Sequence, residues 1–265
     1  MPDRPPGSLV AQRTYDWPEL YEASYHDVYP GEIDFYDGLL RRFGVAGGLL
    51  LDLAGGSGRV ARPLRERGWS PVVLDRAPAM LRACRAHAIA AFQADMGDLR
   101  MAGDARFAAC LGSLGAVGLL WRMEAAQRFF GGLGRVLRVG GIALLVAVSA
   151  EDPASVVPHA AVWDARRGAI QTRSWFTLLP ECGPGERDLL RFDYKIVAST
   201  SRASVLLRDG GLLRMLSRRW VERALDAAPE LEILGWLPLF DAATALLRTP
   251  PSGQIASALV LRKRS

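Results

Sequence analysis

Three acidic side chains each follow a short apolar run in the first half of the chain. The run Leu49–Leu51 leads into Asp52, the run Trp69–Leu74 ends in Asp75, and a third short run ends at Asp95. The first two runs are typical of buried strands. Parallel strands bring their carboxyl ends to one edge of a sheet, where an acid about 20 residues after a glycine turn can hydrogen-bond a ribose diol. We therefore predict a nucleoside-binding crevice at this edge.

A turn of small residues, Ala54–Gly58, joins the first run to a helical pattern formed by Val60, Ala61 and Leu64. Glycine lets the backbone turn sharply and lets a ligand approach closely. Dinucleotide-binding enzymes place glycines as G-x-G-x-x-G to seat a pyrophosphate. The glycines here are Gly55, Gly56 and Gly58, with none at 59–61, so a nicotinamide site is disfavoured. Taken alone, the turn is equally compatible with an ordinary strand-to-helix connection.

Four motifs in order, DLAGGSG, VVLDRAPAML, QADMGDL and LGRVLRVGGIALL, resemble the class I (Rossmann-like) S-adenosylmethionine-dependent methyltransferases. The resemblance covers roughly residues 45 to 150. It implies S-adenosyl-L-methionine as cofactor and S-adenosyl-L-homocysteine as product. It also implies an α/β fold with a doubly wound, seven-stranded, mostly parallel sheet. Ala108 departs from the family, which usually carries Asp at that position in an F-D-x-V strand.

The resemblance assigns cofactor roles to several residues. Asp52 is expected near the methionine amino group and Asp75 at the ribose, although an acid at the end of a strand can instead cap the next helix. Asp95 is expected beside the adenine amino group, with Asp98 as its alternative. Met96 is expected either on the adenine ring or in the core. The full set of expected cofactor contacts is Tyr15, Tyr25, Asp52, Ala54, Gly56, Gly58, Asp75, Arg76, Met80, Asp95, Met96 and Gly112.

The chain divides into four expected regions. Residues 1–45 form an N-terminal tail, disordered over 1–13, and a helical lid, and residues 46–150 form the cofactor-binding core. Residues 151–215 have short strands and polar turns that indicate an antiparallel β insertion, which the resemblance places over the substrate. Residues 216–265 add a last helix, capped by Ser217, and two antiparallel strands.

The acceptor pocket is expected between the N-terminal aromatic segment, the loop GSLGAVG at 112–118 and the insertion. The N-terminal tyrosines either cover the cofactor or pack a helix on the sheet. Tyr25, His26 and His159 are the candidates for catalysis, the histidines as general bases near neutral pH, with an incidental packing or surface role as the favoured alternative for each histidine. The residues expected to shape this pocket are Tyr21, Tyr25, His26, Trp121, His159 and Trp163.

The predicted reaction is methyl transfer to a nitrogen or oxygen of a small molecule. The GSLG segment and the strand-rich insertion partly resemble amino-sugar N-methyltransferases, which often carry His soon after the glycine, where this chain has Ala116. The alternatives are a non-catalytic S-adenosylmethionine-binding protein, an RNA methyltransferase or a nicotinamide-dependent oxidoreductase. The chain has no N/D-P-P-Y/F tetrad and no Pro-Cys nucleophile, which argues against amino methylation of DNA adenine or glutamine and against cytosine C5 chemistry.

Composition and charge limit the expected cellular location and partners of the protein. The chain has 265 residues, is 50% hydrophobic and carries a formal charge of +5. It has no long apolar run and no secretory signal pattern, so we expect a cytoplasmic protein without a membrane partner. The three cysteines are widely spaced and predict neither a metal site nor a disulfide framework. Arginines are scattered rather than clustered, which makes a nucleic-acid partner an unfavoured alternative. A homodimer is the first oligomer to test.

Overall fold

The computed structural model describes residues 11–152, 158–181, 188–241, 247, 250 and 256–265. Three parts of the sequence lie outside these residues: 1–10 of the expected tail, Cys182, and most of 249–253, where the sequence indicates a turn between the last two strands. The described part of the chain forms two sheets, one with seven strands and one with five. None of the described helices combines the length and the apolar character needed to cross a bilayer.

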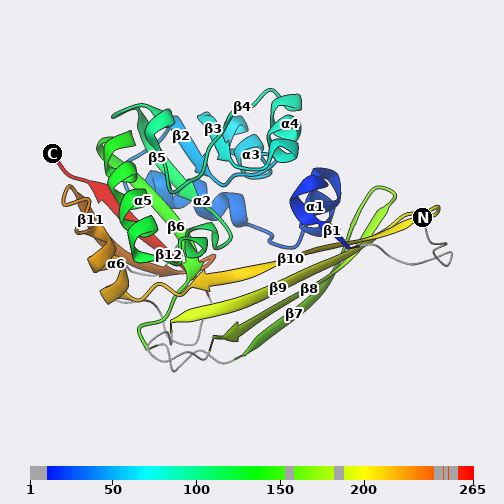
Figure 1. Cartoon of the computed structure of the whole chain (residues 1–265). Coiled ribbons are helices and arrows are strands. Elements are labelled where there is room, and N and C mark those ends of the chain that lie inside the picture. The colour runs from blue at the N-terminus through cyan, green and yellow to red at the C-terminus, as the bar shows by residue number, and fades with distance from the viewer. Residues whose placement is uncertain (1–10, 153–157, 182–187, 242–246, 248–249, 251–255) are drawn as a thin grey trace.

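The larger sheet has the strand order β11-β12-β6-β5-β2-β3-β4 (Figure 1). The five strands from β6 to β4 are parallel, whereas β12 is antiparallel to both β6 and β11. The predicted seven-stranded, mostly parallel sheet is thereby confirmed. Its strands are β2 (Gly48–Leu53), β3 (Trp69–Asp75), β4 (Ala90–Gln93), β5 (Phe107–Gly112), β6 (Leu137–Val148), β11 (Leu231–Pro238) and β12 (Ala256–Lys263).

Helices cover both faces of this sheet, because its central strands are apolar on both sides. All six residues of β5 are buried. One apolar core contains Phe129 and Phe130, and the other, on the opposite face, contains Tyr36 and Leu64. The helices are α2 (Glu32–Arg42), α3 (Ala61–Glu66), α4 (Pro78–Ala86), α5 (Met123–Val136) and α6 (Arg218–Leu225). As predicted, the Ser217 side chain caps α6, accepting a hydrogen bond of 3.2 Å from the Trp220 backbone N–H.

The second sheet contains the antiparallel strands β7 (His159–Arg167), β8 (Ile170–Pro180), β9 (Leu189–Ser199) and β10 (Ser204–Arg214). Its fifth strand, β1 (Ala11–Arg13), pairs in parallel with β10. Residues 11–13 were expected in a disordered tail, and this expectation was wrong. Strand β10 is also longer than the sequence pattern indicates, because its apolar run Val205–Leu207 is followed by polar and glycine residues, yet the strand continues to Arg214. The pair Gly210-Gly211 interrupts its apolar pattern. Gly210 lies close to the neighbouring strand β9, where a Cβ would be only 2.9 Å from the Phe192 carbonyl oxygen.

The N-terminal helix α1 (Pro18–Ser24) lies on the second sheet, between it and the core (Figure 1). Trp163 Nε1 donates a hydrogen bond of 2.7 Å to the Ser24 carbonyl, and the Tyr194 and Ser24 hydroxyls are 3.1 Å apart. Glu22 pairs with Arg62 of α3 at 2.6 Å and with Arg167 of β7 at 2.5 Å. The helix is therefore bound both to the core and to the second sheet.

Candidate cofactor and acceptor site

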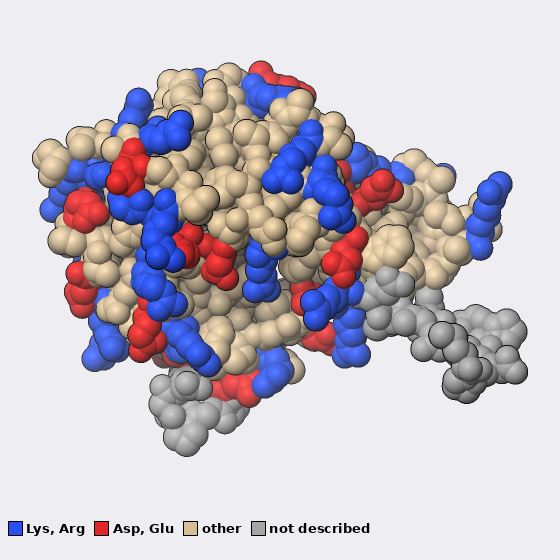
Figure 2. Space-filling view, turned by 45° about the horizontal axis from the view of Figure 1, so that its top comes forward, with Lys and Arg blue, Asp and Glu red and all other residues tan. Residues whose placement is uncertain are grey.

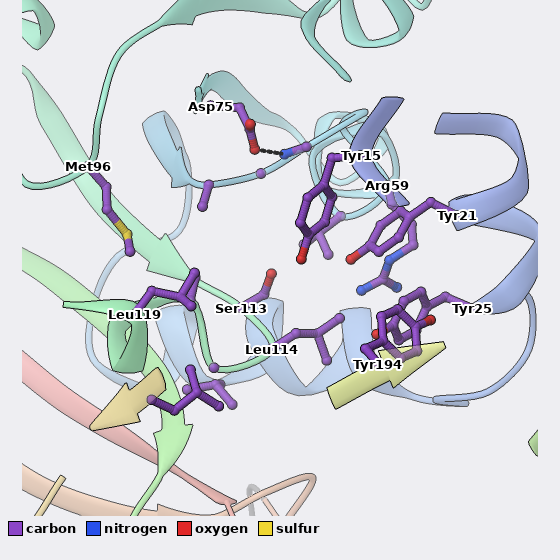
Figure 3. Close-up of a pocket in the computed structure, with 18 of the residues that line it drawn as sticks. Tyr15, Tyr21, Tyr25, Arg59, Asp75, Met96, Ser113, Leu114, Leu119 and Tyr194 are labelled. Atoms are coloured by element: carbon purple, nitrogen blue, oxygen red, sulfur yellow. Dashed lines mark hydrogen bonds between the residues drawn. The ribbon is translucent and has the colours of Figure 1, made fainter. Parts of the chain in front are cut away.

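A cavity of about 420 Å³ lies where the carboxyl ends of the parallel strands face the second sheet and α1. The turn after β2, the end of β3 and the segment after β4 form one part of its wall. The loop after β5, the N-terminal tyrosines and the inner face of the second sheet form the other part (Figure 3). The cavity therefore joins the crevice predicted from the strand-end acids to the predicted acceptor pocket.

The turn at 54–58 bends because three of its residues have left-handed backbone angles, with φ of 52° at Ala54, 59° at Gly56 and 80° at Gly58. Residue 55 must be small for a different reason, which is lack of space. A Cβ there would lie 2.5 Å from the Asp52 carboxylate, which sits directly beneath the turn. Asp52 is fully buried, and neither of its carboxylate oxygens has a hydrogen-bond partner among the described residues. Burial raises the pKa of Asp52 to about 7, with Arg59 opposing this shift and Asp75 and Glu32 adding to it.

Asp75 lies at the end of β3 and reaches the cavity wall. Its Oδ2 accepts a hydrogen bond of 2.9 Å from the Gly56 N–H, and its Oδ1 accepts one of 2.8 Å from the Ala77 N–H (Figure 3). Burial raises the pKa of Asp75, and the backbone hydrogen bonds from Ala77, Gly56 and Arg76 oppose that rise. Asp75 thus holds the turn and the start of α4, and its remaining lone pairs can still accept hydroxyl groups.

Asp95 and Asp98 are the two acids expected as alternatives near the adenine, and they lie in different places relative to the cavity. Asp95 lies in the cavity wall, with its Oδ1 accepting a hydrogen bond of 2.7 Å from the Gly97 N–H. Asp98 lies outside the cavity wall and pairs with Arg100 at 2.5 Å. Met96 both lines the cavity and belongs to a buried apolar cluster, so the two alternatives for this residue coexist.

The loop after β5 is strained next to the cavity. Leu114 has a φ of 47°, in a region that non-glycine residues occupy at a cost, and Gly115 follows with a φ of 82°. The Gly115 N–H donates a hydrogen bond of 3.1 Å to the Val146 carbonyl, which holds this shape. Ser113 and Leu114 are directed toward the centre of the cavity (Figure 3). Gly115 was a local signal for the turn, but nothing in the sequence pattern indicated strain at Leu114.

Aromatic rings form the wall beneath the second sheet. Tyr25 lies at the centre of this cluster, with its ring centroid 4.9 Å from that of Tyr21 and 6.2 Å from that of Tyr194. Trp163 stacks on Tyr194 at 5.9 Å. Burial is the main cause that raises the tyrosine pKa at Tyr15, Tyr21, Tyr25, Tyr29 and Tyr194. These hydroxyls are therefore neutral at physiological pH and suit positioning better than proton abstraction.

Most residues expected at the site lie in the cavity wall. They are Tyr15, Tyr21, Tyr25, Ala54, Gly56, Asp75, Arg76, Met80, Asp95, Met96, His159 and Trp163. Sequence reasoning missed Arg59, which also lies there and pairs with Glu32 of α2. In a chain with scattered arginines, nothing in the local pattern distinguished it from a surface residue.

Five expected residues lie outside this wall, each for an identifiable reason. Asp52 lies one layer below it, and a Cβ at Gly58 would contact Cys84 Sγ at 3.1 Å. Gly112 faces Val117 and Leu145 in the core. The other two were predicted to shape the acceptor pocket but do not line the cavity: His26 pairs with Asp27 at 3.0 Å on the surface, and Trp121 stacks against Arg122, whose Cζ is 4.5 Å from the ring centroid.

Within the described part of the chain, no three side chains of His, Cys, Asp or Glu are grouped so that they could hold a metal ion. The groups that the cavity does offer are carboxylates, hydroxyls, backbone turns and aromatic rings. This set suits an organic ligand with ribose and amine groups.

Residues 50–141 match the family model described as "Methyltransferase domain". The chain therefore contains a methyltransferase domain. This match confirms the predicted methyltransferase domain, and the strand order of the larger sheet confirms the predicted fold. No curated protein sequence matches the chain.

Solved structures share the fold of this methyltransferase over nearly its whole length. Streptomyces venezuelae DesVI has a TM-score of 0.75 at 17% identity, covering 96% of this chain and 100% of its own. The sugar N-methyltransferase KedS8 from Streptoalloteichus sp. has a TM-score of 0.71 at 18% identity, covering 100% of this chain and 98% of its own. The S-adenosylmethionine-bound CalS10 from Micromonospora echinaspora has a TM-score of 0.69 at 18% identity, covering 92% and 97%.

Proposed function

We propose that this methyltransferase methylates a nitrogen of a small, largely apolar molecule that it receives as an uncharged amine. The observation that carries the proposal is the continuity of the cavity, which runs from the crevice at Asp75 to the aromatic wall beneath the second sheet. An oxygen nucleophile would occupy the same place but would need a base to remove its proton.

The residues of the crevice fit the cofactor. Asp75 would hold the ribose, Asp95 the adenine amino group, and Met96 one face of the adenine ring. The turn at 54–56 would lie along the methionine chain, above the buried and unpartnered Asp52 carboxylate. When bound, S-adenosylmethionine supplies a methyl group already activated by the sulfonium charge, for in-line displacement.

The protein's own contribution is to position the acceptor and to exclude water. Tyr25, Trp163, Phe176, Phe192 and Tyr194 surround the acceptor end of the cavity. Such a chamber disfavours a charged ammonium and lowers the pKa of a bound amine. The amine would then present its lone pair without a dedicated base. His159 is the histidine in the cavity wall, and we assign it the role of receiving the proton released after transfer.

The neighbouring structures support nitrogen as the nucleophile. KedS8 is described as a sugar N-methyltransferase, and CalS10 as an amino pentose methyltransferase. MtfA, described as a glycopeptide N-methyltransferase, covers 100% of this chain with a TM-score of 0.53 at 17% identity. Each of these proteins has this fold and an amine-bearing or sugar substrate class in its description.

The distribution of charge on the surface also favours a small molecule over nucleic acid as the methyl acceptor. On the face shown in Figure 2, arginines and lysines alternate with acids rather than forming one continuous basic patch. Elsewhere in the described part of the chain, exposed arginines are also paired with acids, such as Arg191 with Glu181 at 2.8 Å and Arg264 with Glu232 at 2.8 Å. A nucleic-acid groove would instead show a continuous basic stripe. We keep a cytoplasmic homodimer as the working form of the enzyme.

The test is methyl transfer from labelled S-adenosylmethionine to a panel of primary and secondary amines, including amino sugars, with matched alcohols as controls. We expect methylated amine and S-adenosylhomocysteine in equal amounts, with faster transfer as the pH approaches the amine's own pKa. Transfer to alcohols alone would contradict the assignment of nitrogen. Cofactor binding without turnover on amines, alcohols or a metabolite extract would favour the non-catalytic alternative.

A further inference from the structure

Leu114 has a backbone conformation that costs free energy, at a point where the chain borders the cavity. Its φ is 47°, in the left-handed region that residues with a side chain rarely occupy. Contacts from both sheets hold it there. The Gly115 N–H donates a hydrogen bond of 3.1 Å to the Val146 carbonyl of β6, and a Cβ at Gly118 would be 3.1 Å from the Arg214 carbonyl oxygen of β10. The strain at Leu114 persists because its loop is fixed from two sides.

The Leu114 side chain extends into the cavity rather than into the core. Val117 and Leu120 of the same loop belong to a buried apolar cluster. Within the described part of the chain, Leu114 belongs to none of the apolar clusters and is only partly buried. It points instead toward the side of the cavity where Tyr25 and Tyr194 lie (Figure 3). Core packing therefore does not explain a branched apolar side chain at this strained position.

The order of the strands brings Leu114 close to the place where methyl transfer must occur. Strand β5 is parallel to β2 and adjacent to it, and Gly112 pairs with Leu53, so the loop after β5 borders the turn after β2. In the proposed function, the ribose lies at Asp75, the methionine chain lies along that turn, and the acceptor lies against the aromatic wall. The sulfonium methyl must then point from the crevice toward that wall, into the space that Leu114 enters from the side.

We propose that Leu114 is a specificity-determining residue that restricts the acceptor to a primary amine, so that each nitrogen receives one methyl group. This proposal rests on the proposed function. In-line displacement requires the nitrogen to approach the methyl carbon to about 3–3.5 Å, and any further carbon on that nitrogen must fit around the reaction axis. The branched side chain of Leu114 fills this space from the loop side. The hydrogens of a primary amine fit there, whereas an N-methyl group does not.

The restricted reaction is a single transfer. The nitrogen lone pair forms the new N–C bond while the electrons of the C–S bond return to sulfur, which gives S-adenosylhomocysteine and a secondary ammonium. That ammonium loses one proton, which the proposed function assigns to His159. The secondary amine then leaves, because a second transfer would require its N-methyl group to occupy the place of the Leu114 side chain.

The experiment follows both methylation steps, with the primary amine that reacts fastest in the panel and with the N-methyl derivative of that amine. The parent enzyme should give the secondary amine as product, with kcat/KM for the N-methyl derivative at least about tenfold lower. Leu114→Ala should raise the ratio of the second step to the first at least about tenfold and accumulate tertiary amine. Its affinity for S-adenosylhomocysteine, measured by titration calorimetry, should stay like that of the parent.

Two further variants separate this role from a general change in the cavity. Leu114→Gly also removes the side chain, and because glycine adopts a φ of 47° without strain, the loop keeps its fold; this variant should show the same change in ratio. Leu119→Ala is the matched control, since Leu119 belongs to the same loop and lines the cavity on the side of Met96 (Figure 3). It should leave the ratio of the two steps unchanged.

The outcomes differ in what they contradict. An unchanged ratio in both Leu114 variants would overturn the proposal, and so would a parent enzyme that methylates the N-methyl derivative as fast as the primary amine. An equal rise of the ratio in Leu119→Ala would also overturn it, because the size of the whole cavity would then set the limit. A parent enzyme that methylates no amine would instead contradict the proposed function. A rise confined to the two Leu114 variants would establish the restriction at Leu114.

Discussion

Replacing Asp75 by alanine tests the cofactor crevice and the turn together. The substitution removes the acceptor of the hydrogen bonds from Gly56 and Ala77, of 2.9 Å and 2.8 Å, and the proposed bonds to the ribose hydroxyls. Hydrogen bonds to a charged group contribute about 1.5–3 kcal/mol each, and partial exposure of Asp75 places the effect at the lower end. We expect cofactor binding to weaken by about 2 kcal/mol or more, which is at least about 30-fold.

The same substitution should also lower the free energy of unfolding of the cofactor-free enzyme, by about 1–2 kcal/mol, because two backbone N–H groups lose their acceptor. Titration calorimetry with S-adenosylhomocysteine and denaturant unfolding measure the two effects separately. Asp98→Ala is the control, since Asp98 follows the neighbouring strand β4 and pairs with Arg100 outside the cavity wall. Parent-like binding by Asp75→Ala would refute the ribose assignment. Equal weakening of cofactor binding by Asp98→Ala would refute the placement of Asp98 outside the cofactor site.

Three further predictions concern the turn and the histidines. Because the pKa of Asp52 is about 7 in the folded enzyme and about 4 when unfolded, this group should reduce stability as the pH rises from about 4 to about 7, and Asp52→Asn should remove that pH dependence from thermal unfolding. Gly55→Ala should lower the free energy of unfolding by about 1–3 kcal/mol, because its Cβ would lie 2.5 Å from the Asp52 carboxylate, and adding Asp52→Ala should restore part of it in the same denaturation assay. His159→Ala should lower kcat about tenfold, or about 1.4 kcal/mol, because His159 is assigned the proton released after transfer, whereas His26→Ala should not, as steady-state kinetics with one amine will show; equal effects would contradict the placement of these side chains.

Local patterns in the sequence were sufficient for the core of the fold. An apolar run that ends in an acid, followed by a glycine turn and a helical stripe, has few structural solutions, because strand, turn and helix each impose their own spacing of residues. Repeating this unit determines a parallel sheet with its acids on one edge. For this reason the local pattern alone places Asp75 and Asp95 at the crevice. The strands of the antiparallel second sheet could be predicted from the sequence for the same reason. The exceptions are strands that are short, such as β1, or interrupted by glycine, such as β10.

Tertiary structure decided what the side chains at that edge do. Asp52 and Asp75 look alike in the sequence, yet one is enclosed beneath Gly55 and the other reaches the cavity. Arg59 acquires its orientation from Glu32, which belongs to a different helix. His26 and His159 differ because one follows α1 on the surface and the other begins a strand that faces the cavity. Local periodicity shows that a residue lies at a strand end or on a helix, but contacts between distant segments determine its burial, its partners and its charge.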